Sequence, residues 1–163
     1  MESVVFTYGR FNPPHIGHRL LIDKIIEIAR KEKKKPLVVV SHSVGNNKNP
    51  LNVSNKIKIL KSWYPKLKII HSSKELSIAK ISKKFNNNSI MVVGQNRGST
   101  FKFLQFKKVP LKRNISAPSA TMARISAISG NKKKFKSITG YNLTKSIQNK
   151  IISSSIKTKS KKK

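Results

Sequence analysis

The segment Gly9-Arg10-Phe11-Asn12-Pro13-Pro14-His15-Ile16-Gly17-His18 lies between two apolar patterns of different period. The run Val4-Val5-Phe6 before it predicts a short buried strand, and apolar residues recur at helical spacing over residues 16–29. A strand that turns sharply into a helix exposes backbone N–H groups at the helix N-terminus, and such groups bind phosphate. His15 and His18 are three residues apart, so both imidazoles can face this turn. The segment therefore predicts chemistry on a phosphate group.

Length and composition point to a single globular domain. The chain has 163 residues, of which 37% are hydrophobic, and it has no cysteine. Disulfides, thiolate metal sites and cysteine nucleophiles are thereby excluded. The sequence shows neither an apolar run long enough to cross a bilayer nor a signal-peptide pattern. We therefore expect a cytoplasmic protein with no membrane partner; if the gene is viral, as the A/T-rich composition suggests, the location is the host cytoplasm or the virion.

The charge is strongly one-sided, with 36 lysines and arginines against 5 acidic residues and a formal net charge of +31. Clustered cations release counterions from phosphates, so a nucleic-acid partner is one interpretation. A second interpretation is an A/T-rich gene, which favours lysine codons, although such codon usage does not account for the scarcity of aspartate and glutamate. No carboxylate side chain follows Glu75. Glycosidases need a close carboxylate pair and two-metal nucleases need several converging acids, so both classes are excluded.

Strands and helices alternate along the chain, which predicts a doubly wound α/β domain. The expected strands are residues 2–7, 37–40, 67–70, 90–93 and 109–116, and the expected helices are residues 16–29, 55–64, 73–85, 118–128 and 143–156. Continuous apolar strands are typical of a parallel sheet that is buried on both faces, and Pro110 should keep the last strand short or at an edge. We therefore expect a mostly parallel, five-stranded Rossmann-like sheet flanked by helices over residues 1–156. A disordered lysine-rich tail is expected over residues 157–163.

The segment around His15 and His18 resembles a known signature. Nucleotidyltransferases of the cytidylyl/adenylyltransferase superfamily carry a (T/H)-x-G-H box after the first strand, and Gly9-Arg10-Phe11 is most similar to their archaeal-type nicotinamide-mononucleotide adenylyltransferases and phage or viral relatives. A second match is Ser119-Ala120-Thr121-Met122-Ala123-Arg124, which fits the S-x-T-x-x-R element of the family. A third, weaker match is Gly94-Gln95-Asn96-Arg97, in which Asn96 replaces the aspartate of G-S-D-R. The resemblance spans residues 4–130.

The resemblance implies a role for each matched residue. His15 and His18 would bind the triphosphate and the charge that develops at its α-phosphorus, and Arg124 would join them as the third catalytic residue. The remaining residues expected to bind nucleotide or phosphate are Gly9, Arg10, Phe11, Gly17, Ser119 and Thr121. Asn96 and Arg97, with Arg10, are candidates for the second substrate. Mg²⁺ would be carried by the nucleoside triphosphate, with no protein metal site.

Each of these residues also has a structural interpretation. The two histidines could belong to a metal site or simply start a helix, and Thr121 with Arg124 could be a helix cap and a solvated cation. Arg10 and Arg97 could be surface charges. We expect His42 and His71 to be structural or solvated. Trp63 and Tyr64 are expected in the core, and Lys132-Lys133-Lys134 is expected to be solvated or to contact nucleic acid.

The sequence thus favours a nucleotidyltransferase that moves AMP, or next CMP, from a nucleoside triphosphate to a phosphorylated small molecule. Nicotinamide mononucleotide is the first acceptor to consider. The acceptor phosphate is already largely ionised at neutral pH, because its second pKa is about 6, so no general base is needed. The alternative is a basic nucleic-acid-binding protein on the same fold in which catalysis is lost or secondary.

Overall fold

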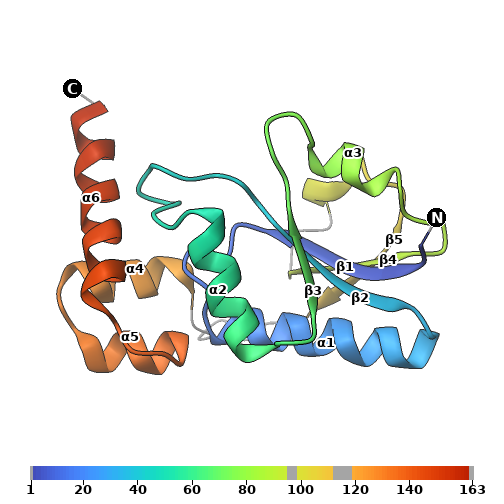
Figure 1. Cartoon of the computed structure of the whole chain (residues 1–163), viewed down its shortest axis with the longest axis horizontal. Helices are drawn as coiled ribbons and strands as arrows, with labels where there is room; N and C mark the ends of the chain where they lie inside the picture. Colours follow the sequence, from blue (N-terminus) through green and yellow to red (C-terminus); the bar gives the residue numbers. More distant parts are fainter. Residues whose placement is uncertain (1, 95–98, 112–118, 162–163) are drawn as a thin grey trace.

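Five parallel strands form the centre of the computed structural model, which describes residues 2–94, 99–111 and 119–161 (Figure 1). They are β1 (Val4–Gly9), β2 (Lys35–Val40), β3 (Lys68–His71), β4 (Ile90–Gly94) and β5 (Lys107–Leu111). Their order in the sheet is β3-β2-β1-β4-β5, and every neighbouring pair is parallel. The expected five-stranded Rossmann-like sheet is confirmed, and Pro110 lies on an edge strand.

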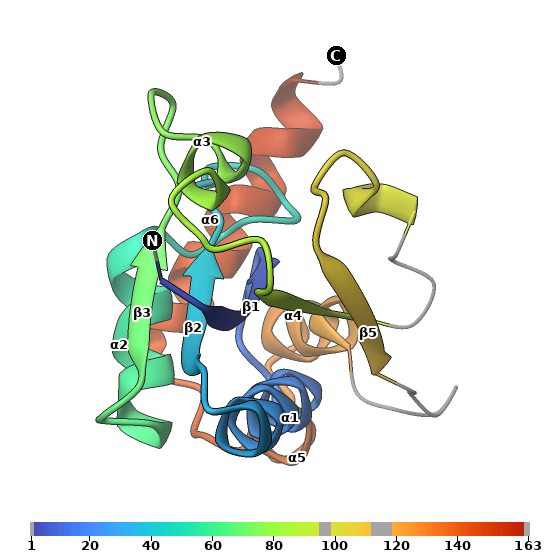
Figure 2. The ribbon, with the colours of Figure 1, turned by 90° about the vertical axis from the view of Figure 1, so that its right-hand side faces the viewer.

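Helices cover both faces of the sheet, with α1 (Ile16–Glu32) on one side and α3 (Ile78–Ser82) on the other (Figure 2). Alternate strand residues point to opposite faces, which explains the two separate cores. Val5, Val38 and Val92 pack with α1 and with α2 (Val53–Trp63). Phe6, Val39 and Met91 pack with α3 and Phe85 on the other face. Burial on both faces is the reason that β2 and β4 contain the uninterrupted apolar runs 37–40 and 90–93.

Three helices follow the sheet and have a small core of their own (Figure 1). They are α4 (Ala120–Ile128), α5 (Lys132–Thr139) and α6 (Lys145–Lys161). Two hydrogen bonds join this helical unit to the first strand-to-helix connection: the Tyr141 hydroxyl donates to the Pro14 carbonyl over 2.8 Å, and the Arg124 guanidinium donates to the Asn12 carbonyl over 2.9 Å. None of the described helices combines the length and the apolar character that a membrane crossing requires.

Helix α6 extends to Lys161, into the lysine-rich segment from residue 157, whose disorder stays a prediction. No proline or glycine interrupts the sequence after Gly140, and lysine is a good helix former whose charge is favourable at a helix C-terminus. The sequence reading also missed α5. Asn131 caps that helix, Gly140 ends it in the left-handed conformation, and Phe135 and Ile138 are buried at helical spacing.

Two other helices differ from their expected bounds. The helix expected over residues 73–85 is reduced to Ile78–Ser82, because the hydroxyls of Ser73 and Ser77 accept backbone N–H bonds from Leu76 and Lys80. Such local bonds compete with helix formation upstream of a cap. Helix α2 begins at Val53 with Asn52 as its N-cap, instead of being capped by Ser54. The last strand begins two residues earlier than expected, at Lys107, and residues 112–116 of the expected strand lie outside the described residues.

Candidate active site

The connection from β1 to α1 is a constrained turn. Phe11 has a left-handed backbone with φ of 49°, a conformation that side-chain-bearing residues adopt at a cost of about 1–3 kcal/mol. Its ring is 1% exposed, so packing holds the conformation in place. The buried Asn12 amide donates to the Leu51 carbonyl over 2.9 Å and accepts the Leu51 N–H over 2.8 Å. These contacts fix the turn and attach the loop before α2 to it.

The imidazoles of His15 and His18 cap the N-terminus of α1, because each accepts a backbone N–H at the start of this helix. The Nδ1 atom of His15 accepts the Gly17 N–H over 3.0 Å, and the Nδ1 atom of His18 accepts the His15 N–H over 3.0 Å. A neutral ring that accepts at Nδ1 carries its hydrogen on Nε2, so both imidazoles are Nε2–H donors. The two ring centroids are 3.7 Å apart, and the Phe11 ring lies 4.5 Å from that of His18. The same hydrogen bonds that cap the helix at Nδ1 therefore also fix Nε2–H as the donor of each ring.

Arg124 reaches the same turn from α4. One guanidinium nitrogen donates to the Asn12 carbonyl and, over 3.4 Å, to the Lys48 carbonyl, while the other donates to the Thr121 hydroxyl over 3.2 Å. Ser119 is the N-cap of α4, and its hydroxyl accepts the Met122 N–H. Burial lowers the pKa of Arg124, and repulsion from Arg10 lowers it further. The S-x-T-x-x-R element thus places its arginine against the first connection of the sheet.

These residues line one cleft of about 540 Å³. It lies where β1 and β4 end, which is the switch point in strand order at which doubly wound folds bind their ligands. The sequence-predicted residues that line it are Gly9, Arg10, Phe11, His15, Gly17, His18, Ser119, Thr121 and Arg124. Asn96 and Arg97 lie outside the described residues, and the roles assigned to all of them stay predictions.

The lining of the cleft carries positive charge and no carboxylate. Arg10, Lys48 and Arg124 contribute the cations, and no aspartate or glutamate is among the described lining residues. The described part of the chain also has no group of three or more histidine, cysteine or acidic side chains that could hold a metal. A cleft with this lining attracts anions, and phosphate oxygens and water are the ligands that it leaves for a divalent cation.

Lys56, which the sequence reading did not single out, lies directly beneath this lining. Its side chain is fully buried, and its Nζ atom donates to the Arg10 carbonyl over 2.9 Å and to the Ser41 carbonyl over 2.6 Å. Burial lowers the pKa of Lys56 to about 8, and repulsion from Arg10 contributes. The only signal in the sequence is its position four residues before Leu60, on the buried face of α2.

The other residues singled out from the sequence do not line the cleft. His42 is exposed, and its Nδ1 atom is 2.7 Å from the Ser72 hydroxyl, while the Nδ1 atom of His71 is 2.8 Å from the Ser72 carbonyl. Trp63 is half-buried with the Arg19 guanidinium 5.2 Å from its ring, and the Tyr64 hydroxyl donates to Asp23 over 2.6 Å. These contacts give both histidines and both aromatic residues structural roles.

Comparison with solved structures finds the same fold. The chain superimposes on a macrolide-efflux protein from Streptococcus pneumoniae with a TM-score of 0.65 and 16% identity, over 88% of this chain and 66% of that one. A bifunctional NMN adenylyltransferase/ADP ribose pyrophosphatase from Francisella tularensis, complexed with AMP and a Mn ion, gives a TM-score of 0.65 and 20% identity, over 93% of this chain. The chain spans about half of that protein, 52% of its length.

Sequence comparison gives the family. No curated protein matches the chain by sequence. The sequence profile of the cytidylyltransferase-like family matches residues 6–158, which include the β1–α1 connection, the loop before α2 and helix α4. Those three segments are the ones that the hydrogen bonds of Asn12 and Arg124 bring together. The chain therefore belongs to the cytidylyltransferase-like family.

Proposed function

We propose that this protein transfers a nucleoside monophosphate from a nucleoside triphosphate to the phosphate of a small molecule. The observation that carries the proposal is the pairing of two Nε2–H imidazole donors, His15 and His18, with the Arg124 guanidinium in a cleft whose described lining lacks carboxylates. Donors of this kind neutralise the charge that builds up on phosphoryl oxygens. ATP is the first nucleotide to consider and CTP the next.

The reaction needs positioning more than it needs proton transfer. An ionised oxygen of the acceptor phosphate forms a bond to the α-phosphorus, the bond from that phosphorus to the bridging α–β oxygen breaks, and pyrophosphate leaves with the electron pair. His15 and His18 would donate to the α-phosphate, and Thr121 with Arg124 would hold the β- and γ-phosphates. Mg²⁺ would enter with the triphosphate, bound by its oxygens and water. Among the residues described around the cleft, none offers a carboxylate to hold it.

Nicotinamide mononucleotide is the first acceptor that we propose. Gly9-Arg10-Phe11 is similar to the adenylyltransferases that use it, and the Francisella tularensis protein with the same fold is described as an NMN adenylyltransferase. The cleft also has an aromatic wall, because Tyr8 and Phe101 both line it with ring centroids 6.1 Å apart. Such a wall suits a flat ring.

Pyrophosphate release tests the proposal directly. The purified protein is given Mg²⁺, either ATP or CTP, and a panel of phosphorylated acceptors led by nicotinamide mononucleotide. Release that requires both one nucleotide and one acceptor is expected, and His42→Ala, which changes an exposed histidine outside the described cleft lining, should keep the wild-type rate. Absence of release with every pair would contradict the proposal.

A second candidate function, nucleic-acid binding, is favoured by the placement of lysines on α5. Lys132, Lys133 and Lys134 are exposed in the first turn of this helix, where positive charge opposes the helix dipole. No carboxylate follows Glu75 in the sequence to balance them. Three cations kept at an unfavourable end of a helix suit a polyanion such as duplex nucleic acid.

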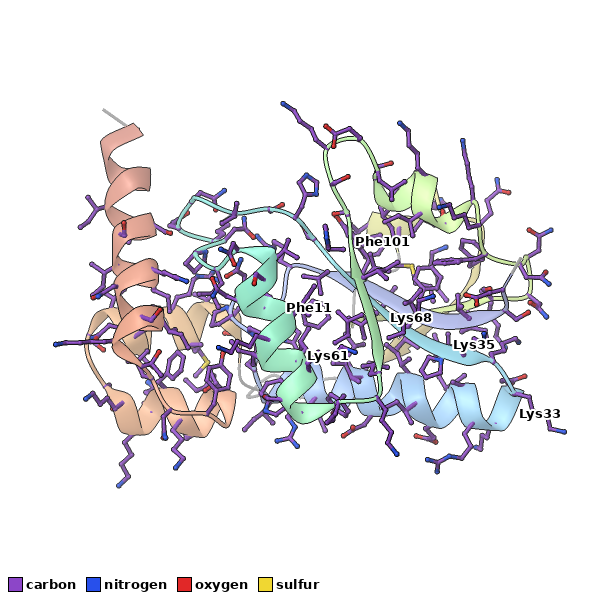
Figure 3. All side chains as sticks on the ribbon, in the orientation of Figure 1. Phe11, Lys33, Lys35, Lys61, Lys68 and Phe101 are labelled. Carbon is purple, nitrogen blue, oxygen red and sulfur yellow. The ribbon has the colours of Figure 1, made fainter. Side chains whose placement is uncertain are left out.

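Salt dependence of DNA binding tests this second candidate. Each phosphate that a lysine contacts contributes about 0.9 to the slope of log affinity against log salt. If the three lysines contact three phosphates, the triple alanine variant should have a slope that is smaller in magnitude by about 2.7. Lys33→Ala is the control, because this side chain points away from the body at the end of α1 remote from α5 (Figure 3). An unchanged slope in the triple variant would contradict a role for α5.

A further inference from the structure

Lys56 joins the ends of two central strands beneath the cleft. Its ammonium donates to the carbonyl of Arg10, one residue beyond β1, and to the carbonyl of Ser41, one residue beyond β2. Arg10 and Ser41 both line the cleft, whereas Lys56 itself is fully buried behind them. Lys56 therefore acts on the cleft by positioning Arg10 and Ser41 and not by lining it.

The charge of this ammonium has no negative partner in the described protein. Lysines are almost never fully buried unless they are paired. The described ion pairs join Lys24, Lys34, Lys35 and Lys68 to glutamates elsewhere, and none includes Lys56. The charged and titratable side chains on the neighbouring segments are Arg10, His15 and His18 after β1, His42 after β2, and Lys48 in the loop before α2, with Arg124 bonded to that loop. All of them are bases.

Two carbonyl dipoles thus offset a full positive charge, next to a cleft lined by further cations. A bound polyanion would complete the balance, because the phosphates would lie in front of Arg10 and Ser41 while the ammonium lies behind them. By linkage, a ligand that favours the charged form of Lys56 must itself bind more tightly when that form is present.

We propose that Lys56 is a positioning residue whose buried ammonium fixes the β1 and β2 ends that form the cleft and couples the binding of polyphosphate to its own protonation. This inference rests on the proposed function only in that the cleft binds a polyphosphate; it does not require turnover. Because burial brings the pKa of Lys56 to about 8, the coupling acts at pH values where the protein can be studied.

The experiment measures binding of inorganic tripolyphosphate to the whole chain, which avoids any assumption about base or acceptor. Calorimetric titrations run from pH 6.5 to 9.5 at low salt, in two buffers of different ionisation enthalpy so that bound protons are counted. Lys56→Arg keeps a charge at every pH, and Lys56→Met has none. Lys58→Met is the matched control, because it removes an exposed lysine two residues along the same helix.

Wild-type affinity is expected to fall, relative to Lys56→Arg, on the order of tenfold between pH 7 and 9.5, the effect of one unit charge near a ligand of several charges. Subtracting the Lys56→Arg profile removes the titration of tripolyphosphate itself. At pH 8.5 the wild type should take up about half a proton more than Lys56→Arg on binding, for a pKa raised by about one unit. Lys56→Met should show the low affinity at pH 7 and no extra proton uptake, and Lys58→Met should follow the wild type.

A role in structure alone would change the affinity without changing its pH profile. Parallel profiles for wild type and Lys56→Arg, or for wild type and Lys56→Met if the larger arginine prevents folding, would overturn the inference. The proposed function would survive that result. Conversely, the predicted profile without pyrophosphate release from any nucleotide and acceptor would leave the inference standing and reject the proposed function. No binding of tripolyphosphate to the wild type would reject both.

Discussion

Replacing Lys56 with methionine removes a buried cation, and the effect on stability should depend on pH. Burial lowers the pKa of Lys56 to about 8 in the folded protein, whereas the ordinary lysine value is 10.5. Between these values the unfolded state binds more protons than the folded state, so the free energy of unfolding rises with pH. Below pH 8 both states are protonated and the folded protein bears the full cost of the buried charge. That cost is relieved as the pH rises through 8 toward 10.5.

The size of the effect follows from the shift. A difference of about 2.5 pKa units corresponds to about 3 kcal/mol, at about 1.36 kcal/mol for each unit. Between pH 7 and pH 10 the two titration curves account for roughly 2.5 kcal/mol of this amount. The free energy of unfolding of the wild type, minus that of Lys56→Met, should therefore rise by roughly 2.5 kcal/mol over this range.

Urea unfolding followed by circular dichroism measures this difference at each pH. All other lysines and the tyrosines are common to both proteins, so their titration cancels in the subtraction. Lys58→Met, which removes an exposed lysine of the same helix, should give a difference from wild type that stays within a few tenths of a kcal/mol at all pH values. A wild-type curve that runs parallel to that of Lys56→Met from pH 7 to 10 would refute the assignment of a strongly perturbed buried ammonium.

Three further substitutions test the cleft. His18→Ala should lower pyrophosphate release roughly 10²–10³-fold, the cost of removing one preorganised donor, and an unchanged rate would exclude His18 from the mechanism. Arg124→Lys keeps the charge but loses the two-nitrogen contact of the guanidinium with Asn12 and Thr121, so the Kd for tripolyphosphate measured by calorimetry should rise about tenfold. Arg30→Lys, at an exposed position on α1, is the control. Equal Kd values for the two variants would contradict the role of this contact. Gly9→Ala places a methyl group 3.2 Å from the buried Phe11 ring and should reduce the free energy of unfolding by about 1–3 kcal/mol, whereas a wild-type urea midpoint would mean that the ring moves without cost.

The sequence sufficed for the central strands of the sheet because they obey a simple rule. Val38-Val39-Val40 and Ile90-Met91-Val92-Val93 are buried on both faces, and a strand in that environment has no polar position to break its pattern. The two segments that resemble family motifs also lie where their neighbouring residues predict them, one between β1 and α1 and the other at the N-terminus of α4, while their roles stay predictions. Local patterns predict local structure.

Features that depend on distant partners could not be read in this way. Lys56 looks like any helical lysine until α2 is packed against the ends of β1 and β2, where it meets two carbonyls from residues 46 and 15 positions away. The bonds between Asn12 and Leu51 are of the same kind. Helix α5 is a different case, because Asn131, the buried Phe135 and Ile138, and Gly140 were visible signals that its lysines obscured.

In the proposed reaction, a nucleoside monophosphate, with its α-phosphorus, moves from a nucleoside triphosphate to another phosphate in this cleft. The most direct test supplies ATP, or CTP, labelled either at the α- or at the γ-phosphorus, together with Mg²⁺ and the acceptor panel, and follows the label by chromatography. We expect the α-label in a new acceptor adduct, in equal amount to the γ-label in pyrophosphate, and we expect both products to disappear in a His15→Ala/His18→Ala variant. Transfer of the γ-label to the acceptor, or an undiminished rate in that variant, would rule out the proposed reaction.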